Sequence, residues 1–198
     1  DNLKCKILII MNFNSPIKIK KYNNDSVQAE IVLIEKGKAT TDLGLESWQV
    51  DAINNAHENN SNFHSFHTAN GLKVIVCIDL SGDKAAHLYA EAARKAGNNL
   101  LAEIKKYNVV SLVVSHKLST CFLHEFAEGL VMGAYAFQKY LSKKAIQTIE
   151  KVYLNCGDVT EQSIAELNTV LEANYIARDL VNEPVITLTA TKLSEAFV

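Results

Sequence analysis

The chain has 198 residues, 48% of them hydrophobic, and its 20 basic and 22 acidic side chains give a formal net charge of −2. A chain of this length buries about 70% of its unfolded surface, so it is expected to fold as a globular protein without a structural metal or disulfide. The charge balance excludes the strongly basic surface that binding to nucleic acid or anionic lipid requires. We predict a cytoplasmic protein, because no hydrophobic run has membrane-spanning length and the N-terminus lacks a signal-peptide layout.

The cysteines support the same compartment. Cys5, Cys77, Cys121 and Cys156 lie far apart in the sequence, each within an apolar segment. This distribution is typical of buried free thiols in a reducing environment, and no cysteine has a recognisable partner histidine.

The first third of the chain predicts two strands and a helix. Residues 7–11 and 27–34 are short apolar runs rich in β-branched side chains, which favour strands. Asp42 is a plausible N-cap, and the apolar positions over residues 43–58 follow a helical rhythm. Between the two strands, Lys18, Lys20 and Lys21 are interpreted as a solvated turn in preference to a phosphate site.

A β-hairpin follows. Residues 63–68 alternate large and polar side chains, Asn70-Gly71 is typical of a type I′ turn, and residues 72–80 are strongly apolar. The second strand does not alternate, which is expected of a strand covered on both faces. We therefore place it in the interior of a sheet.

From residue 84 onward, long helices alternate with strands. The predicted elements are a helix over 84–107, a strand over 109–115, a helix over 121–141, a strand over 152–156 and a helix over 160–182. This order indicates parallel strands joined by crossover helices. With the hairpin added, the sequence predicts a three-layer α/β/α sandwich around a mixed, mainly parallel sheet. Thr189 is expected to cap one further helix.

Apolar stripes define the inner faces of the long helices. In the first the stripe contains Ala85, Leu88, Ala92, Ala96, Leu100 and Ile104, with Gly97 on or near the buried side. In the second it contains Leu123, Phe126, Leu130, Ala134, Phe137 and Leu141. Gly129 and Gly133 lie four residues apart on the second helix, which favours close packing of that helix onto the sheet.

The sequence contains neither GxGxxG nor GxxxxGK[ST], so the usual nucleotide-phosphate loops are absent. The segment Ser81-Gly82-Asp83 follows a predicted strand and could offer backbone amides to an anion. We favour an ordinary strand-to-helix turn there, with Ser81 or Asp83 as the cap.

Metal and nucleophile motifs are also incomplete. His64 and His67 are three residues apart on a predicted strand and point to opposite faces. His124 and Glu128 are one helical turn apart but fail the HExxH pattern, so we interpret them as a solvated helix face. There is no GxSxG motif, and the three other histidines considered, His57, His87 and His116, are isolated. The sequence thus predicts no catalytic, cofactor-binding or metal-ligating residue.

Two segments carry a family resemblance. Residues 177–184 read ARDLVNEP and are followed by Leu188-Thr189, and residues 126–137 read FAEGLVMGAYAF with Tyr140 just beyond. In this order and spacing they resemble the leucine aminopeptidase (cytosol aminopeptidase) family, in which an RxLVNEP-like segment joins two domains. The resemblance extends from about Val74 to Thr189.

The resemblance implies a domain division and an activity. Residues 1–183 would form the non-catalytic N-terminal domain, macro-like in fold and including the linker helix 160–182, and residues 184–198 would begin the C-terminal catalytic domain. Members of the family are metal-dependent leucyl aminopeptidases that remove N-terminal residues from peptides with two divalent metals, zinc or manganese, usually as hexamers. Their lysine and carboxylate ligands would lie beyond Val198, so this chain is expected to bind no metal and to be inactive alone.

The same resemblance implies partners, and two other functions are considered. The domain would contact its own catalytic domain and further copies in a hexamer, and the parent enzyme would act on peptides. One alternative is a macro-like module that binds a nucleotide such as ADP-ribose through the Ser81-Gly82-Asp83 turn. The other is a regulatory DNA-binding domain, which the acidic charge balance disfavours.

Overall fold

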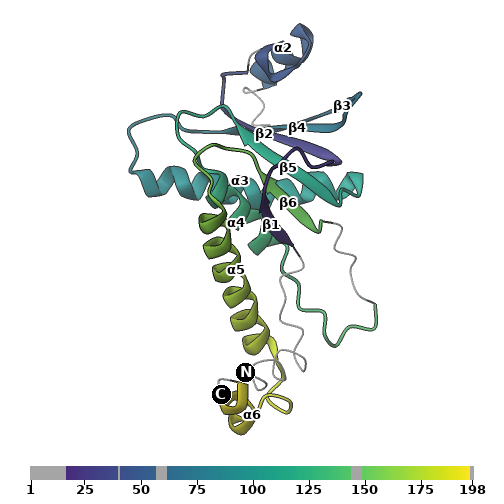
Figure 1. Ribbon diagram of the computed structural model, residues 1–198, viewed down its shortest axis with the longest axis vertical. Helices are drawn as coiled ribbons and strands as arrows, with labels where there is room; N and C mark the ends of the chain where they lie inside the picture. Colours follow the sequence, from purple (N-terminus) through teal and green to yellow (C-terminus); the bar gives the residue numbers. More distant parts are fainter. Residues whose placement is uncertain (1–16, 40, 57–61, 144–148, 197–198) are drawn as a thin grey trace.

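The computed structural model describes residues 17–39, 41–56, 62–143 and 149–196. A six-stranded mixed sheet in the order β1-β6-β5-β2-β4-β3 lies between helices on its two faces (Figure 1). The predicted three-layer α/β/α sandwich is therefore confirmed. The predicted strand at residues 7–11 and Cys5 fall outside the described residues.

Parallel pairing dominates the sheet. The strands are β1 (Lys18–Lys21), β2 (Ala29–Glu35), β3 (Phe63–Thr68), β4 (Gly71–Ile78), β5 (Ser111–His116) and β6 (Lys151–Leu154). All neighbouring strands are parallel except β3 and β4, which form the predicted antiparallel hairpin. β4 lies between β2 and β3, so its apolar run is covered on both faces, as its composition predicts.

Within the described ranges, five α-helices accompany the strands. They are α2 (Ser47–Asn55), α3 (Ala86–Ile104), α4 (Leu123–Gly133), α5 (Glu161–Asn182) and α6 (Ala190–Ala196), with short 3-10 turns at Thr41–Leu43 and Lys105–Tyr107. A capping box starts α5: the Thr160 hydroxyl accepts from the Ser163 amide, and the Ser163 hydroxyl accepts from the Thr160 amide. Thr189 caps α6 as predicted. No described helix combines the length and the apolar character needed to cross a bilayer.

The core has two unequal parts, one on each face of the sheet. Alternate residues of β2 separate them: Ile31 and Leu33 pack with α3, α4 and α5, whereas Val32 and Ile34 pack toward α2. The first part is much the larger. On the second face, α2 contributes a single fully buried side chain, Ile53.

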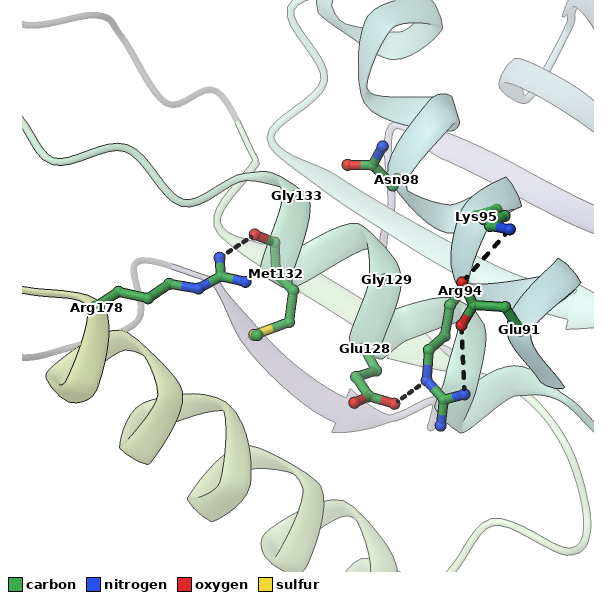
Figure 2. Close-up of a pocket in the computed structure, with 9 residues that line it drawn as sticks. All are labelled: Glu91, Arg94, Lys95, Asn98, Glu128, Gly129, Met132, Gly133 and Arg178. Carbon is green, nitrogen blue, oxygen red and sulfur yellow. Dashed lines mark hydrogen bonds and ion pairs between the residues drawn. The ribbon is translucent and has the colours of Figure 1, made fainter. Parts of the chain in front are cut away.

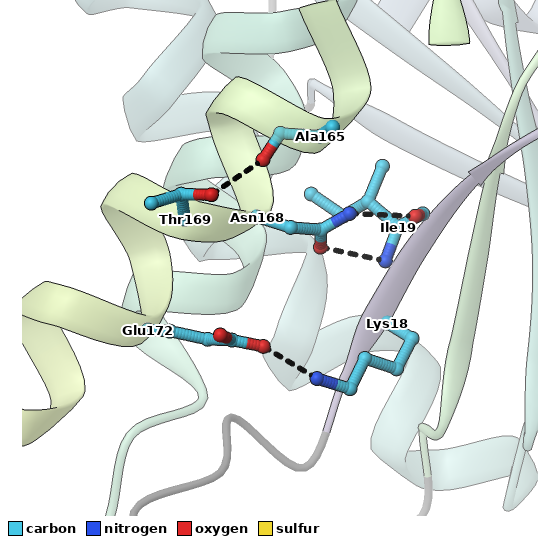
Figure 3. Close-up of polar contacts among 6 residues, drawn as sticks. All are labelled: Lys18, Ile19, Ala165, Asn168, Thr169 and Glu172. Atoms are coloured by element: carbon cyan, nitrogen blue, oxygen red, sulfur yellow. Dashed lines mark hydrogen bonds and ion pairs between the residues drawn. The ribbon is translucent and has the colours of Figure 1, made fainter. Parts of the chain in front are cut away.

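The predicted turn at the lysine run is wrong, because those residues form the edge strand β1. Ile17 and Ile19 alternate with the lysines and are buried. This alternation of buried and exposed side chains is the pattern of a β-strand with one covered face. The Asn168 side chain of α5 accepts from the Ile19 amide (3.2 Å) and donates to the Ile19 carbonyl (2.9 Å), while Lys18 pairs with Glu172 at 2.6 Å (Figure 3). Part of the open backbone of this edge is therefore covered by α5.

The second long helix is shorter than predicted, because α4 ends at Gly133 and not near Leu141. The following residues leave the helix, and the side chains of Tyr135, Lys139 and Tyr140 bind the end of α5. Leu141, predicted to be on the buried stripe, has 55% of its surface exposed. Tertiary hydrogen bonds have overridden the helical periodicity here.

Two local predictions also require correction. The inner face of α3 is rotated: Leu88 is exposed, and the buried residues are Ala93, Gly97, Leu100, Leu101 and Ile104. The hairpin turn is not type I′, because Ala69 and Asn70, its two central residues, both have negative φ. Instead, the Thr68 hydroxyl accepts from the Asn70 amide and donates to the Gly71 carbonyl.

Candidate functional site

Helices α3 and α4 cross in direct backbone contact. A Cβ atom added to Gly97 would lie 2.0 Å from the Phe126 carbonyl oxygen, and one added to Gly129 would lie 2.0 Å from the Arg94 carbonyl oxygen. Only glycine fits at either position without moving a backbone. The prediction of close packing at Gly129 is confirmed, but the predicted partner is wrong, because Gly129 packs against the backbone of α3 and not against the sheet.

An open pocket of about 360 Å³ lies beside this crossing and extends to Arg178 of α5 (Figure 2). Four of its five charged side chains pair with one another, and the fifth, Arg178, donates to the Met132 carbonyl. Arg94 binds Glu128 at 2.6 Å, and Glu91 lies 3.9 Å from Arg94 and 3.7 Å from Lys95. Because these cations are already paired with carboxylates, the pocket suits contact with a complementary surface better than capture of a phosphate.

A polar junction joins the segment after α4 to the end of α5. The Tyr135 hydroxyl donates to Asp179 at 2.7 Å, and Arg178 donates to the Met132 carbonyl at 2.8 Å. Glu183, the residue that ends α5, accepts from both Lys139 and Tyr140. The α5 terminus is thereby fixed to a segment more than forty residues earlier in the chain.

Glu183 is the one buried charged residue in the described part of the core, with 8% of its surface exposed. Burial alone would raise the pKa of its carboxyl, but the hydrogen bonds from Lys139 and Tyr140 outweigh burial and lower the pKa below its ordinary value. At neutral pH it is a carboxylate that holds this junction together.

Large apolar side chains are exposed around the same junction. Val181 and Val185 have 85% of their surface exposed and Ile186 has 90%. Such a group beside a fixed helix end is typical of a surface that another protein domain covers.

The Ser81-Gly82-Asp83 turn satisfies its own polar groups. The Asp79 carboxylate accepts from the Ser81 amide at 2.9 Å and from the Ser81 hydroxyl at 2.6 Å. The helix after the turn begins at Ala86 with Ala85 as its N-cap, so the prediction of Ser81 or Asp83 as the cap is wrong. The Ser81 amide that an anion would need is already bound.

The predicted solvated face at His124 and Glu128 is also corrected. His124 Nε2 lies 2.9 Å from the Ser163 hydroxyl of α5, and Glu128 binds Arg94 of α3, so both join helices together. On β3, His67 packs edge-on against Tyr107. His57 falls outside the described residues.

The structure brings together three residues that sequence reasoning treated separately. Ligand atoms of His116, Cys121 and Cys156 all lie within 4.8 Å of one another, so His116 is not isolated and the two cysteines are not far apart. Burial and a hydrogen bond with Cys156 raise the pKa of Cys121 to about 12. A usable signal existed: His116 and Cys156 both lie at the carboxyl ends of buried strands, and parallel strands end at the same sheet edge. Cys77 is buried as predicted, and burial raises its pKa to about 11.

Comparison with known proteins assigns the family. Residues 64–144, from β3 past α4, match the family model described as the cytosol aminopeptidase family, N-terminal domain. Residues 64–144 therefore belong to the N-terminal domain of the cytosol aminopeptidase family. Probable cytosol aminopeptidases of Clostridium tetani and Aquifex aeolicus are 36% identical over 115 residues and 37% identical over 117 residues. The matched parts are 53% and 52% of this chain, and 24% and 23% of those relatives.

Solved structures share the fold of this chain. A tomato leucine aminopeptidase mutant matches with a TM-score of 0.67 at 17% identity, over 90% of this chain and 41% of that one. The bottromycin maturation enzyme BotP in complex with Mn matches with a TM-score of 0.62 at 18% identity, over 85% of this chain and 35% of that one. The α3–α4 crossing and most of the pocket residues lie within the segment that the family model matches.

Proposed function

We propose that this chain is the non-catalytic N-terminal domain of a metal-dependent leucyl aminopeptidase that releases N-terminal amino acids from peptides. Its role would be in assembly of the enzyme and in access to the active site. The observation that carries the proposal is the family match over residues 64–144. The two curated relatives extend well beyond the region matched here, which leaves room for a separate catalytic part.

The chemistry of the described residues supports placing catalysis elsewhere. A two-metal hydrolytic centre needs carboxylates around ions about 3.5–4 Å apart. Among the described residues, the one group with three metal-ligating side chains is His116, Cys121 and Cys156, and it contains no carboxylate. In this proposal the two zinc or manganese ions are held by residues of the catalytic part, where they would activate water for attack on the peptide bond.

The exposed apolar group at Val181, Val185 and Ile186 supports the assembly role. In this proposal residues 1–183 form the domain and the chain after Glu183 enters the catalytic part. That part, or another copy within a hexamer, would cover the exposed side chains.

Activity assays test whether this chain is non-catalytic. With added Zn²⁺ or Mn²⁺, the 198-residue chain should release no leucine from a Leu-anilide substrate, whereas the full-length protein should. Turnover by the 198-residue chain that scales with its concentration would overturn the proposal.

Assembly is tested in the full-length protein. Val181→Asp should lower the oligomeric state measured by sedimentation velocity, because it places a charge in the proposed contact. Val170→Asp is the matched control, because Val170 is an exposed valine on the same helix but away from the junction. Equal behaviour of the two variants would remove the assembly role. No described contact favours ADP-ribose or DNA as a ligand.

A further inference from the structure

Three chain segments meet at the carboxyl ends of β5 and β6. His116 is the last residue of β5, Cys121 lies just before α4, and Cys156 lies two residues beyond β6. Because β5 and β6 are parallel neighbours, their ends bring His116 and Cys156 together, with Nε2 and Sγ 3.4 Å apart. Cys121 completes the group, which is half-buried.

We propose that His116, Cys121 and Cys156 form a binding site for a thiophilic divalent cation of the Zn²⁺ class. Tetrahedral zinc has Zn–S bonds of about 2.3 Å and Zn–N bonds of about 2.0 Å, so neighbouring ligand atoms lie about 3.5–3.8 Å apart. The 3.4 Å separation of His116 Nε2 and Cys156 Sγ is close to this spacing. The group contains three protein ligands among the described residues, and water would complete the tetrahedron.

The choice of cation follows from the ligand types. Two thiolates and an imidazole prefer zinc and similar soft ions over Mg²⁺ or Ca²⁺, which prefer oxygen ligands. Binding displaces the two thiol protons. The three ligands come from separate segments: the end of β5, the residues after β6 and the residues before α4. The fold therefore fixes their relative positions before any metal binds.

The hydrogen bonds of His116 define what binding must change. The Leu118 amide donates to His116 Nδ1 at 3.2 Å, so in the metal-free protein the neutral ring carries its proton on Nε2, facing Cys156. A cation at Nε2 requires that proton to move to Nδ1, and the Leu118 amide then loses its acceptor. The segment 117–118 must turn slightly, and an amide NMR shift at Leu118 would report this.

The binding experiment uses the 198-residue chain, reduced and stripped with a chelator. Zn²⁺ is titrated in competition with a chromophoric chelator, and metal content is measured after gel filtration. We expect one equivalent per chain, a higher thermal unfolding midpoint with Zn²⁺, and thiolate-to-metal charge-transfer absorption with Co²⁺. Cys121→Ser, Cys156→Ser and His116→Gln should each weaken binding at least about 10-fold.

Cys77→Ala is the matched control, because Cys77 is a cysteine on the other face of the sheet and should leave binding unchanged. Circular dichroism of each variant checks folding, and X-ray absorption of the unmodified Zn²⁺ complex gives an independent ligand count of two sulfurs and one nitrogen. Failure to bind, equal binding by the Cys121→Ser/Cys156→Ser double variant, or ligation by oxygen alone would overturn the proposal. If dissolved oxygen oxidised Cys121 and Cys156 of the stripped chain to a disulfide even with Zn²⁺ present, that result would also overturn the proposal.

Discussion

The two faces of the sheet are built by different means. On one face, α3, α4 and α5 cover a continuous core, and α3 and α4 touch through glycine backbones. On the other face, the nine-residue α2 and the segment before it cover a small cluster. The residues matched to the cytosol aminopeptidase family contain the glycine crossing and do not contain α2.

This difference predicts which face of the sheet is the more stable. Helices α3 and α4 cross with their backbones in contact, and no side-chain atom can be added there without moving a backbone. We therefore expect the helices of the first face to unfold together with the sheet. A short helix with one fully buried side chain should open locally at lower cost. Four predictions test this contrast, beginning with the largest effect.

Gly129→Ala should lower the free energy of unfolding by about 3 kcal/mol or more, because its new methyl group would lie 2.0 Å from the Arg94 carbonyl oxygen. Urea denaturation followed by circular dichroism measures the change. Gly157→Ala is the control, because a Cβ there meets no atom within 4 Å, and it should change the free energy by less than about 0.5 kcal/mol. Similar losses in both variants would mean that the helices do not cross in backbone contact.

Ile53→Ala should remove about 2–4 kcal/mol from the local stability of α2, because Ile53 is fully buried in the smaller cluster. Hydrogen exchange should show lost protection in α2 while α3 and α4 keep theirs. Leu100→Ala, on the larger face, is the comparison and should lower protection throughout. Uniform loss in Ile53→Ala would show that the two faces are one cooperative unit.

Asn168→Ala should lower the free energy of unfolding by about 1–2 kcal/mol, because it removes both side-chain hydrogen bonds to Ile19 on edge strand β1. Lys18→Ala removes the exposed ion pair to Glu172 in the same contact and should cost less than about 0.5 kcal/mol. Both are measured by urea denaturation. If the lysine variant were the more damaging, charge and not backbone pairing would hold β1 to α5.

Glu183→Gln should cost about 1 kcal/mol at pH 7 by weakening the hydrogen bonds from Lys139 and Tyr140. Because the folded-state pKa of Glu183 is below its unfolded value, its contribution is complete above the unfolded pKa of about 4.5 and is lost as pH falls through the lower folded value. Denaturation between pH 3 and pH 7 should therefore show a smaller difference between the two proteins at the acid end. A difference that grows on acidification would reverse the assigned shift.

Much of the fold follows from local patterns. The apolar run of β4 predicted its strand correctly, because burial on both faces leaves a direct trace in sequence. Thr189 likewise predicted the start of α6, because a capping side chain at a helix start is visible in sequence. The end of α4 was not predictable in this way, because it depends on Tyr135, Lys139 and Tyr140 finding partners on α5.

The features of the candidate site were also predicted only in part from the sequence. The spacing of Gly129 and Gly133 indicated close helix packing, but the identity of the facing helix required coordinates. The group of His116, Cys121 and Cys156 was missed because its members are 5 and 35 residues apart along the chain, and only the parallel pairing of β5 and β6 brings them together.

The length of α5 has a mechanical consequence. Asn168 fixes its first half to β1, and its 22 residues form a rod about 33 Å long that extends away from the sheet (Figure 1). From Asn168 to Asn182 the helix rises about 21 Å, so a tilt of about 5° about the Asn168 contact would displace the far end by about 2 Å. Small shifts in packing would therefore be magnified at Val181 and Glu183. The polar junction of Tyr135, Lys139 and Tyr140 with the end of α5 restrains this tilt. Loss of these hydrogen bonds would therefore change the position of the α5 terminus relative to the sheet.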